Sequence, residues 1–161
     1  MESGAQRVVE SHPPDALEAH GLGYETLKTI NPGLIFTSVT PFGNQGPYKD
    51  FKATDLVLYH MSGHAHGLLG AVEDPDSNPP IRAGGHQAEL VGGMAAATAT
   101  LMALYRKRMT GKGCRIDISS FEAMVNQLIS GLANCAYGRP APPRDAREVE
   151  EAAAAGIMTS T

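Results

Sequence analysis

Apolar and polar positions divide the first part of the chain into strand-like and helix-like segments. Residues 7–10 are β-prone, and residues 34–39 form a continuous apolar and β-branched run, which is typical of a strand buried on both faces. Between them a short helical segment opens at Leu17, and residues 24–30 keep helical spacing until the breaker at residues 31–33. This strand, helix, strand order predicts an α/β fold with parallel strands and packed helices.

The middle of the chain, residues 40–89, is predicted to be a linker and loop region that contains a short helix. Two glycines and two prolines within residues 41–48 are incompatible with a regular element there. The apolar residues 54–61 predict a helix that is capped at Asp55 and ended by Ser62-Gly63.

Helical periodicity is strongest over residues 89–109, where bulky side chains are spaced among alanines and Gly111 follows as a stop signal. Residues 114–119 alternate between apolar and polar side chains, which predicts a half-buried strand, and residues 120–135 predict a further helix. Residues 138–161 begin proline-rich and continue charged and alanine-rich, so we expect a linker and a poorly ordered tail.

Composition and charge favour a soluble protein with one domain spanning residues 1–137. The chain has 161 residues, of which 42% are hydrophobic, enough for a real core. A net charge of -4 without a basic stripe argues against a nucleic-acid partner. The apolar run 90–105 is shorter than the roughly 20 residues that cross a bilayer, so we expect it to form a buried helix of a soluble protein. No signal peptide is apparent, so we expect a cytoplasmic protein without a membrane partner. Cys114 and Cys135 are expected to be small buried side chains.

Glu89 is the first candidate for chemistry. It follows the glycine pair Gly84-Gly85 and stands before residues 90–105, a stretch that contains no other charge. A carboxylate where a flexible loop meets an apolar helix is a candidate reactive group. The structural alternative is an acidic residue in the first turn that complements the helix dipole.

Four histidines are candidate metal ligands. His60, His64 and His66 are close in sequence, and His86 lies near Glu89, but their spacing matches no metal motif. We therefore expect loop or substrate-facing histidines and no metal, with His60 or His86 as a candidate proton carrier.

Short motifs are spread over roughly residues 7–138 of the chain. They are Val8-Val9-Glu10, Gly21-Leu22-Gly23-Tyr24, Asn31-Pro32, Leu34-Ile35 with Ser38, Phe42-Gly43 with Gly46-Pro47-Tyr48, Asp55-Leu56, Met61-Ser62-Gly63, Thr110-Gly111-Lys112-Gly113 and Asp117-Ile118-Ser119. In this order and spacing they resemble the family III CoA-transferases of the CaiB/BaiF type, the group that includes formyl-CoA transferase and α-methylacyl-CoA racemase.

The resemblance implies a particular architecture and activity. Family members have a Rossmann-like large domain and a smaller domain, and two subunits interlock as a homodimer. This chain is expected to be a large-domain fragment that lacks N- and C-terminal parts. The implied reaction moves CoA from an acyl-CoA donor to a small carboxylic acid, so the CoA thioester is a substrate and no cofactor is permanently bound.

The resemblance also implies that Glu89 is the covalent nucleophile. The family uses an aspartate there, and glutamate would place its oxygens about 1.5 Å further out. A carboxylate of either length can carry an acyl group. Gly84, Gly85 and His86 would form the substrate loop, and amides at the start of the 89–109 helix are expected to stabilise an oxyanion.

Contacts to CoA are implied at three residues. Lys52 falls where formyl-CoA transferase has a lysine facing the nucleotide phosphates, and an ammonium group suits that role. Ser11 and His12 occupy the place of an Asn-Phe pair that contacts CoA in better-known members. A solvated loop lysine is the alternative for Lys52.

Two other functions remain open from the sequence. In the racemase branch a histidine lies immediately before the aspartate that matches Asp55, but this chain has Thr54 there, and His60, one and a half turns later, is a candidate substitute. A non-catalytic fragment that contributes to folding or assembly is the other alternative. The sequence does not identify the acyl donor or acceptor.

Overall fold

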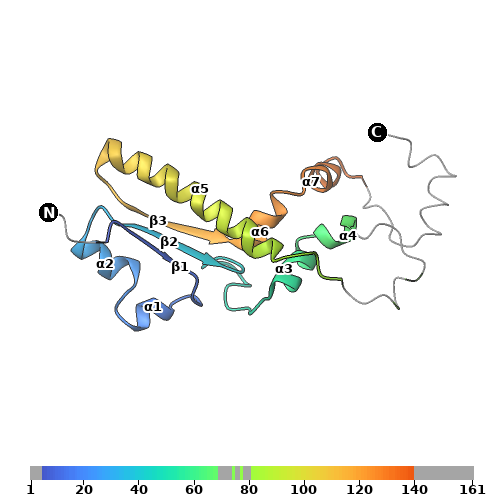
Figure 1. The fold of residues 1–161 in the computed structure, drawn as a ribbon, viewed down its shortest axis with the longest axis horizontal. Coiled ribbons are helices and arrows are strands. Elements are labelled where there is room, and N and C mark those ends of the chain that lie inside the picture. Colours follow the sequence, from blue (N-terminus) through green and yellow to red (C-terminus); the bar gives the residue numbers. More distant parts are fainter. Residues whose placement is uncertain (1–4, 69–73, 75–76, 78–80, 140–161) are drawn as a thin grey trace.

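Three parallel strands form the sheet in the part of the chain that the structure describes. The computed structural model describes residues 5–68, 74, 77 and 81–139 (Figure 1). The strands are β1 (Arg7–Glu10), β2 (Ile35–Thr40) and β3 (Cys114–Ser119), in the spatial order β1-β2-β3. Both strand pairs are parallel, which confirms the predicted α/β class.

Strand β2 lies in the centre of the sheet, and this explains its apolar, β-branched sequence. Of its six residues, five are buried, because neighbouring strands cover both edges and helices cover both faces. Strand β3 alternates between partly buried and exposed positions. The predictions of a fully buried strand over residues 34–39 and a half-buried strand over residues 114–119 are therefore confirmed.

Within the described residues, seven helices accompany the strands, and α2 and α5 pack on the sheet (Figure 1). Most predicted helices are present, and residues 24–30 form a helix with the predicted bounds. The helices are α1 (Ala16–Ala19), α2 (Tyr24–Ile30), α3 (Asp55–Met61), α4 (His64–Leu68), α5 (Gln87–Thr110), α6 (Ser120–Val125) and α7 (Ile129–Ala136).

The two faces of the sheet bear different helices. Phe36 of β2 packs with Tyr24 of α2 in one hydrophobic cluster. The next residue, Thr37, points to the opposite face because side chains alternate along a strand. There its hydroxyl is 2.8 Å from the hydroxyl of Thr100 in α5. Helix α5 therefore lies across the face opposite α2, as Figure 1 shows.

Residues 120–135 were predicted to form one helix, and this is wrong. Helix α6 ends at Val125 and α7 begins at Ile129. In an uninterrupted helix the carbonyl of Met124 would accept from the amide of Leu128. Here that carbonyl accepts from Nε2 of His64 and from the Gln127 amide, each at 2.9 Å, and the Leu128 amide donates to Val125 instead. A local turn and a tertiary contact thus replace the helical hydrogen bond at the break.

Two burial expectations are also corrected. The apolar run 90–105 is not fully buried, because α5 packs one face on the sheet and leaves Leu101, Met102 and Tyr105 exposed.

By length and composition α5 could also span a membrane, which alone is weak support for a membrane role. Cys135 is exposed, whereas Cys114 is partly buried. The predicted tail falls largely on residues 140–161, outside the described part of the chain.

Candidate functional site

The carboxyl ends of the three strands carry a row of polar side chains. Glu10, Ser38 and Asp117 occupy matching positions on β1, β2 and β3. The Ser38 hydroxyl donates to the Glu10 carboxylate, and the Asn44 side-chain amide donates to Ser38 and to Asp117, at 3.1 and 3.0 Å. Three of the family-like motifs therefore meet at one place, and the loop after β2 is tied to the end of β3.

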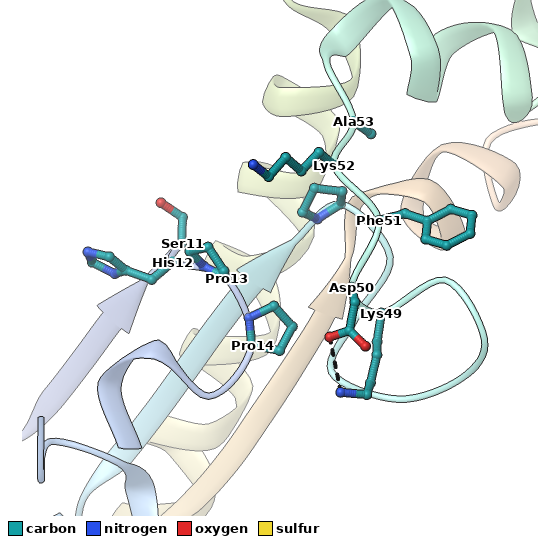
Figure 2. A pocket seen from close by; sticks show the side chains of 10 residues that line it. Ser11, His12, Pro13, Pro14, Lys49, Asp50, Phe51, Lys52 and Ala53 are labelled. Atoms are coloured by element: carbon teal, nitrogen blue, oxygen red, sulfur yellow. Dashed lines mark hydrogen bonds and ion pairs between the residues drawn. The ribbon is translucent and has the colours of Figure 1, made fainter. Parts of the chain in front are cut away.

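A cavity of about 280 Å³ opens beside this row, where ligands bind in many parallel α/β sheets. Figure 2 shows it between the segment that follows β1 and the loop that precedes α3. Ser11, His12 and Lys52, the three residues expected to contact CoA, all line it. We call it the Lys52 cavity.

Lys52 supplies the available positive charge of the Lys52 cavity. Its side chain extends toward Ser11 and His12, whereas Phe51 points the other way (Figure 2). Lys49 forms an ion pair with Asp50 at 3.1 Å. Lys52 forms no ion pair with any residue in the described part of the chain, so its ammonium group is free to meet an anion such as a phosphate.

His12 is oriented by the polar row. Its backbone amide donates to Glu10 at 2.7 Å, and its ring Nδ1 lies 3.5 Å from the same carboxylate oxygen. The Glu10 side chain is only 10% exposed, whereas the His12 side chain is 62% exposed, so the carboxylate is packed at the sheet end and the imidazole ring stays open to the cavity. The sheet end therefore fixes the backbone that presents Ser11 and His12 to the cavity.

A second cavity of about 460 Å³ reaches Glu89, and we call it the Glu89 cavity. Its lining includes Glu89 and Asp55, and Ser11, Pro41 and Ala53 line both cavities. The two spaces therefore adjoin along a shared wall. The candidate nucleophile and the candidate CoA contacts, which are far apart in sequence, therefore line two adjoining cavities.

Glu89 is exposed at the first turn of α5. Its side chain is 64% exposed, and Oε2 lies 3.2 Å from Nδ1 of His86. Nη2 of Arg82 is 3.1 Å from both ring nitrogens of His86, so the guanidinium lies over the ring and not along one lone pair. The carboxylate thus has a hydrogen-bonding neighbour and a nearby cation, and it is accessible to a substrate.

Asp55 was predicted to cap its own helix, and this is wrong. It is the first residue of α3, whose cap position is Thr54, and its Oδ1 accepts instead from the amides of Ala88 and Glu89, at 2.8 and 3.4 Å. These are the first-turn amides of α5 that were expected to stabilise an oxyanion. Because these amides already donate to the Asp55 carboxylate, they are not free to donate to an oxyanion.

Tyr59 lies one turn after Asp55 in α3 and is buried. Burial, together with the negative charge of Asp55, raises the pKa of the Tyr59 hydroxyl above its usual value. The phenol is therefore neutral at physiological pH.

The remaining residues of the expected substrate loop lie directly before α5. Gly85 has a φ of 77°, a conformation that other residues adopt at a cost, whereas a side chain at Gly84 would meet open space. Neither position requires a glycine for reasons of packing. The loop brings His86 to Glu89, and the substrate role of this loop stays a prediction.

The histidines do not gather into a metal site. Nε2 of His60 donates to the carbonyl of Ile81 at 3.1 Å, and His64 bonds to Met124. Within residues 5–68, 74, 77 and 81–139 there is no group of three side chains able to hold a metal ion.

The sequence matches CoA-transferase family III over residues 3–159. The chain belongs to that family. The family III match extends over nearly all of the chain, which confirms the resemblance carried by the short motifs.

Several CoA-transferases are similar to this chain. The succinate–glutarate CoA-transferase of Agrobacterium fabrum is 33% identical over 146 residues, which is 86% of this chain and 35% of that protein. The acetyl-CoA:oxalate CoA-transferase of Acetobacter aceti is 35% identical, over 87% of this chain and 35% of that protein. This family III chain therefore spans about a third of the length of these relatives.

The fold agrees with the same family. A crystal structure of a CAIB/BAIF family protein from Brucella suis superposes with a TM-score of 0.73 at 31% identity. The match covers 88% of this chain and 36% of that one. The fold of this family III chain is thus a part of the larger CaiB/BaiF fold.

Two site features were missed by the sequence analysis. The role of Asp55 in capping α5 has no local signal, because the partners are more than 30 residues apart in the chain. The polar row could have been found: Glu10, Ser38 and Asp117 each fall in a strand-like segment, and aligning the carboxyl ends of three parallel strands would have placed them together.

Proposed function

We propose that this chain forms part of the active site of an enzyme that moves CoA from an acyl-CoA donor to a small carboxylic acid, with Glu89 as the covalent carrier. The observation that supports this most is the shared wall of the two cavities. A CoA nucleotide whose phosphates meet Lys52 would pass Ser11 and His12 and direct its thioester toward Glu89.

Each step of the proposed transfer forms one bond and breaks another. A Glu89 oxygen attacks the donor thioester carbon; a C–O bond forms, the C–S bond breaks and CoA leaves as a thiolate. The thiolate attacks the Glu89 carboxyl carbon, which releases the donor acid and leaves CoA on Glu89 as a thioester. The acceptor carboxylate then displaces the thiolate to give a second anhydride. Attack by the thiolate on the acceptor carbon yields the new acyl-CoA and free Glu89.

The environment of Glu89 suits this role. The carboxylate is exposed enough to reach a substrate, and His86 donates to it when Nδ1 carries the proton. The glutamate side chain is longer than the family's aspartate, so the loop before α5 must place the donor thioester correspondingly further from the helix.

The relatives indicate the class of substrates. Their names specify succinate with glutarate and acetyl-CoA with oxalate, so we propose a small organic acid as acceptor. We further propose that the complete protein acts in the cytoplasm as a homodimer without a metal or a permanently bound cofactor.

The test is to incubate the complete gene product with pairs of acyl-CoA and free acid and to measure the new CoA ester by chromatography. Transfer is expected in the wild type and should be abolished in Glu89→Ala. Glu25→Ala removes an exposed carboxylate on α2, remote from the site, and should retain transfer.

Three results would contradict the proposal. Unchanged turnover in Glu89→Ala would exclude the covalent role. Exchange of the α-proton without transfer would favour the racemase alternative. Absence of transfer with every pair tested would favour the alternative that the chain is a non-catalytic fragment.

A further inference from the structure

Helix α5 begins without a cap from its own segment. The residue at its N-cap position, His86, makes no side-chain hydrogen bond to the first turn, and Glu89 lies in that turn. The amides of a first turn need acceptors, because the helix itself supplies none. Asp55 provides one from α3, 33 residues earlier in the chain, through its contact with Ala88.

The contact between Asp55 and α5 is buried. Asp55 is 5% exposed and Ala88 is fully buried. A hydrogen bond from an amide to a carboxylate is strong in such surroundings, and the negative charge also complements the positive end of the helix dipole. The contact therefore fixes the first turn of α5 against the first residue of α3.

The same two elements form walls of the Glu89 cavity, because Asp55 and Glu89 both line it. A glutamate has one more rotatable bond than an aspartate, so its carboxylate can take more positions. A fixed backbone at Glu89 limits these positions. Asp55 Oδ1 accepts the Glu89 amide itself, although the 3.4 Å distance makes this the weaker of the two contacts.

Asp55 has one oxygen to spare. Oδ2 is buried and has no hydrogen-bond partner in the described part of the chain. Capping requires only Oδ1, and the amide oxygen of asparagine could accept the same two amides. Capping and charge can therefore be separated by substitution.

We propose that Asp55 is a positioning residue that holds the first turn of α5, and with it the Glu89 carboxylate, at the wall of the cavity. This inference rests on the proposed function, in which Glu89 carries the acyl group. Asp55 acts through the backbone of Ala88 and Glu89 and not by touching the substrate.

The kinetic test compares Asp55→Ala with Asp55→Asn in the complete gene product. Asp55→Ala is expected to lower kcat for acyl transfer about 10- to 100-fold, because a small displacement of a reacting group costs that much. KM for acyl-CoA should change less than about threefold, since the Lys52 cavity is untouched. Asp55→Asn keeps the accepting oxygen and should retain kcat within about threefold. Glu25→Ala serves as the control for loss of a carboxylate.

A third variant keeps the test decisive if Asp55→Ala does not fold. Asp55→Glu retains the charge but moves the accepting oxygens by about 1.5 Å. It should lose kcat as Asp55→Ala does. Full activity in Asp55→Glu, or a loss in folded Asp55→Asn as large as in Asp55→Ala, would show that charge and not capping matters and would overturn the proposal.

Amide hydrogen exchange separates this proposal from the proposed function. In Asp55→Ala the amides of Ala88 and Glu89 should exchange faster, whereas those of Thr37 and Ile116 in the sheet should not, and Asp55→Asn should match the wild type. Unchanged exchange at Ala88 and Glu89 would overturn the positioning role. Inactive wild-type protein with these exchange results would contradict only the proposed function.

Discussion

Replacing Gly92 by alanine tests how closely helix α5 sits on α6. A Cβ atom at Gly92 would overlap the Ser120 hydroxyl and lie 3.1 Å from the Cβ of Ser120. The hydroxyl can rotate away, but the Cβ of Ser120 is fixed by the backbone. Overpacking of this kind costs about 1–3 kcal/mol, against a gain of about 1 kcal/mol when alanine replaces glycine within a helix.

The adjacent Gly93 provides a matched control. A Cβ there meets no atom within 4 Å, so Gly93→Ala gains helix propensity without a clash. We expect Gly92→Ala to be about 1–3 kcal/mol less stable than Gly93→Ala in urea unfolding. Near 160 residues this corresponds to roughly 2–4 °C in Tm for each kcal/mol.

A double variant tests the cause. Ser120→Ala removes the overlapping hydroxyl, so Gly92→Ala combined with Ser120→Ala should recover part of the loss, with a coupling of about 0.5–3 kcal/mol. If Gly92→Ala is as stable as Gly93→Ala, the close approach of α5 and α6 is wrong.

Further expectations concern the loop, the CoA contact and pH. Gly85→Ala should lose about 1–2 kcal/mol of unfolding free energy because of its positive φ, whereas Gly84→Ala should not; equal losses would contradict the loop geometry. Lys52→Ala should weaken CoA binding in calorimetry about two- to fivefold, as expected for an exposed ion pair, and less so in high salt, while the remote Lys112→Ala should bind as the wild type does. The raised pKa of Tyr59 means that its contribution to stability is full below about pH 10 and is lost as pH rises through the folded-state pKa. Tyr59→Phe should remove that part of the alkaline loss in unfolding experiments, and an unchanged alkaline profile would refute this origin.

Much of the fold follows from local sequence because each element is defined by its own pattern. The apolar run at residues 34–39 can only be satisfied between two strands and two helical layers, and β2 lies there. Helix α2 begins after Gly23 and ends at Asn31, where the breaker residues begin. These signals lie within the elements that they define.

The features that local sequence could not predict depend on contacts between distant segments. The break between α6 and α7 arises where His64 binds the carbonyl of Met124, and no residue near the break indicates it. Asp55 resembles an ordinary cap of its own helix, and only the packing of α3 against α5 shows which amides it accepts. Glu89 could be identified from its local sequence, whereas the contact of Asp55 with the first turn of α5 could not, because it joins two distant segments.

The most direct test of the central claim is to trap the Glu89 carboxyl group while it carries the acyl group or CoA. The complete protein would be incubated with acyl-CoA, quenched with hydroxylamine and digested, and the peptide that contains Glu89 analysed by mass spectrometry. The covalent mechanism predicts a hydroxamate at Glu89 that depends on acyl-CoA and is absent from Glu89→Gln. Transfer activity without modification at Glu89, or with the modification at another carboxylate, would contradict it.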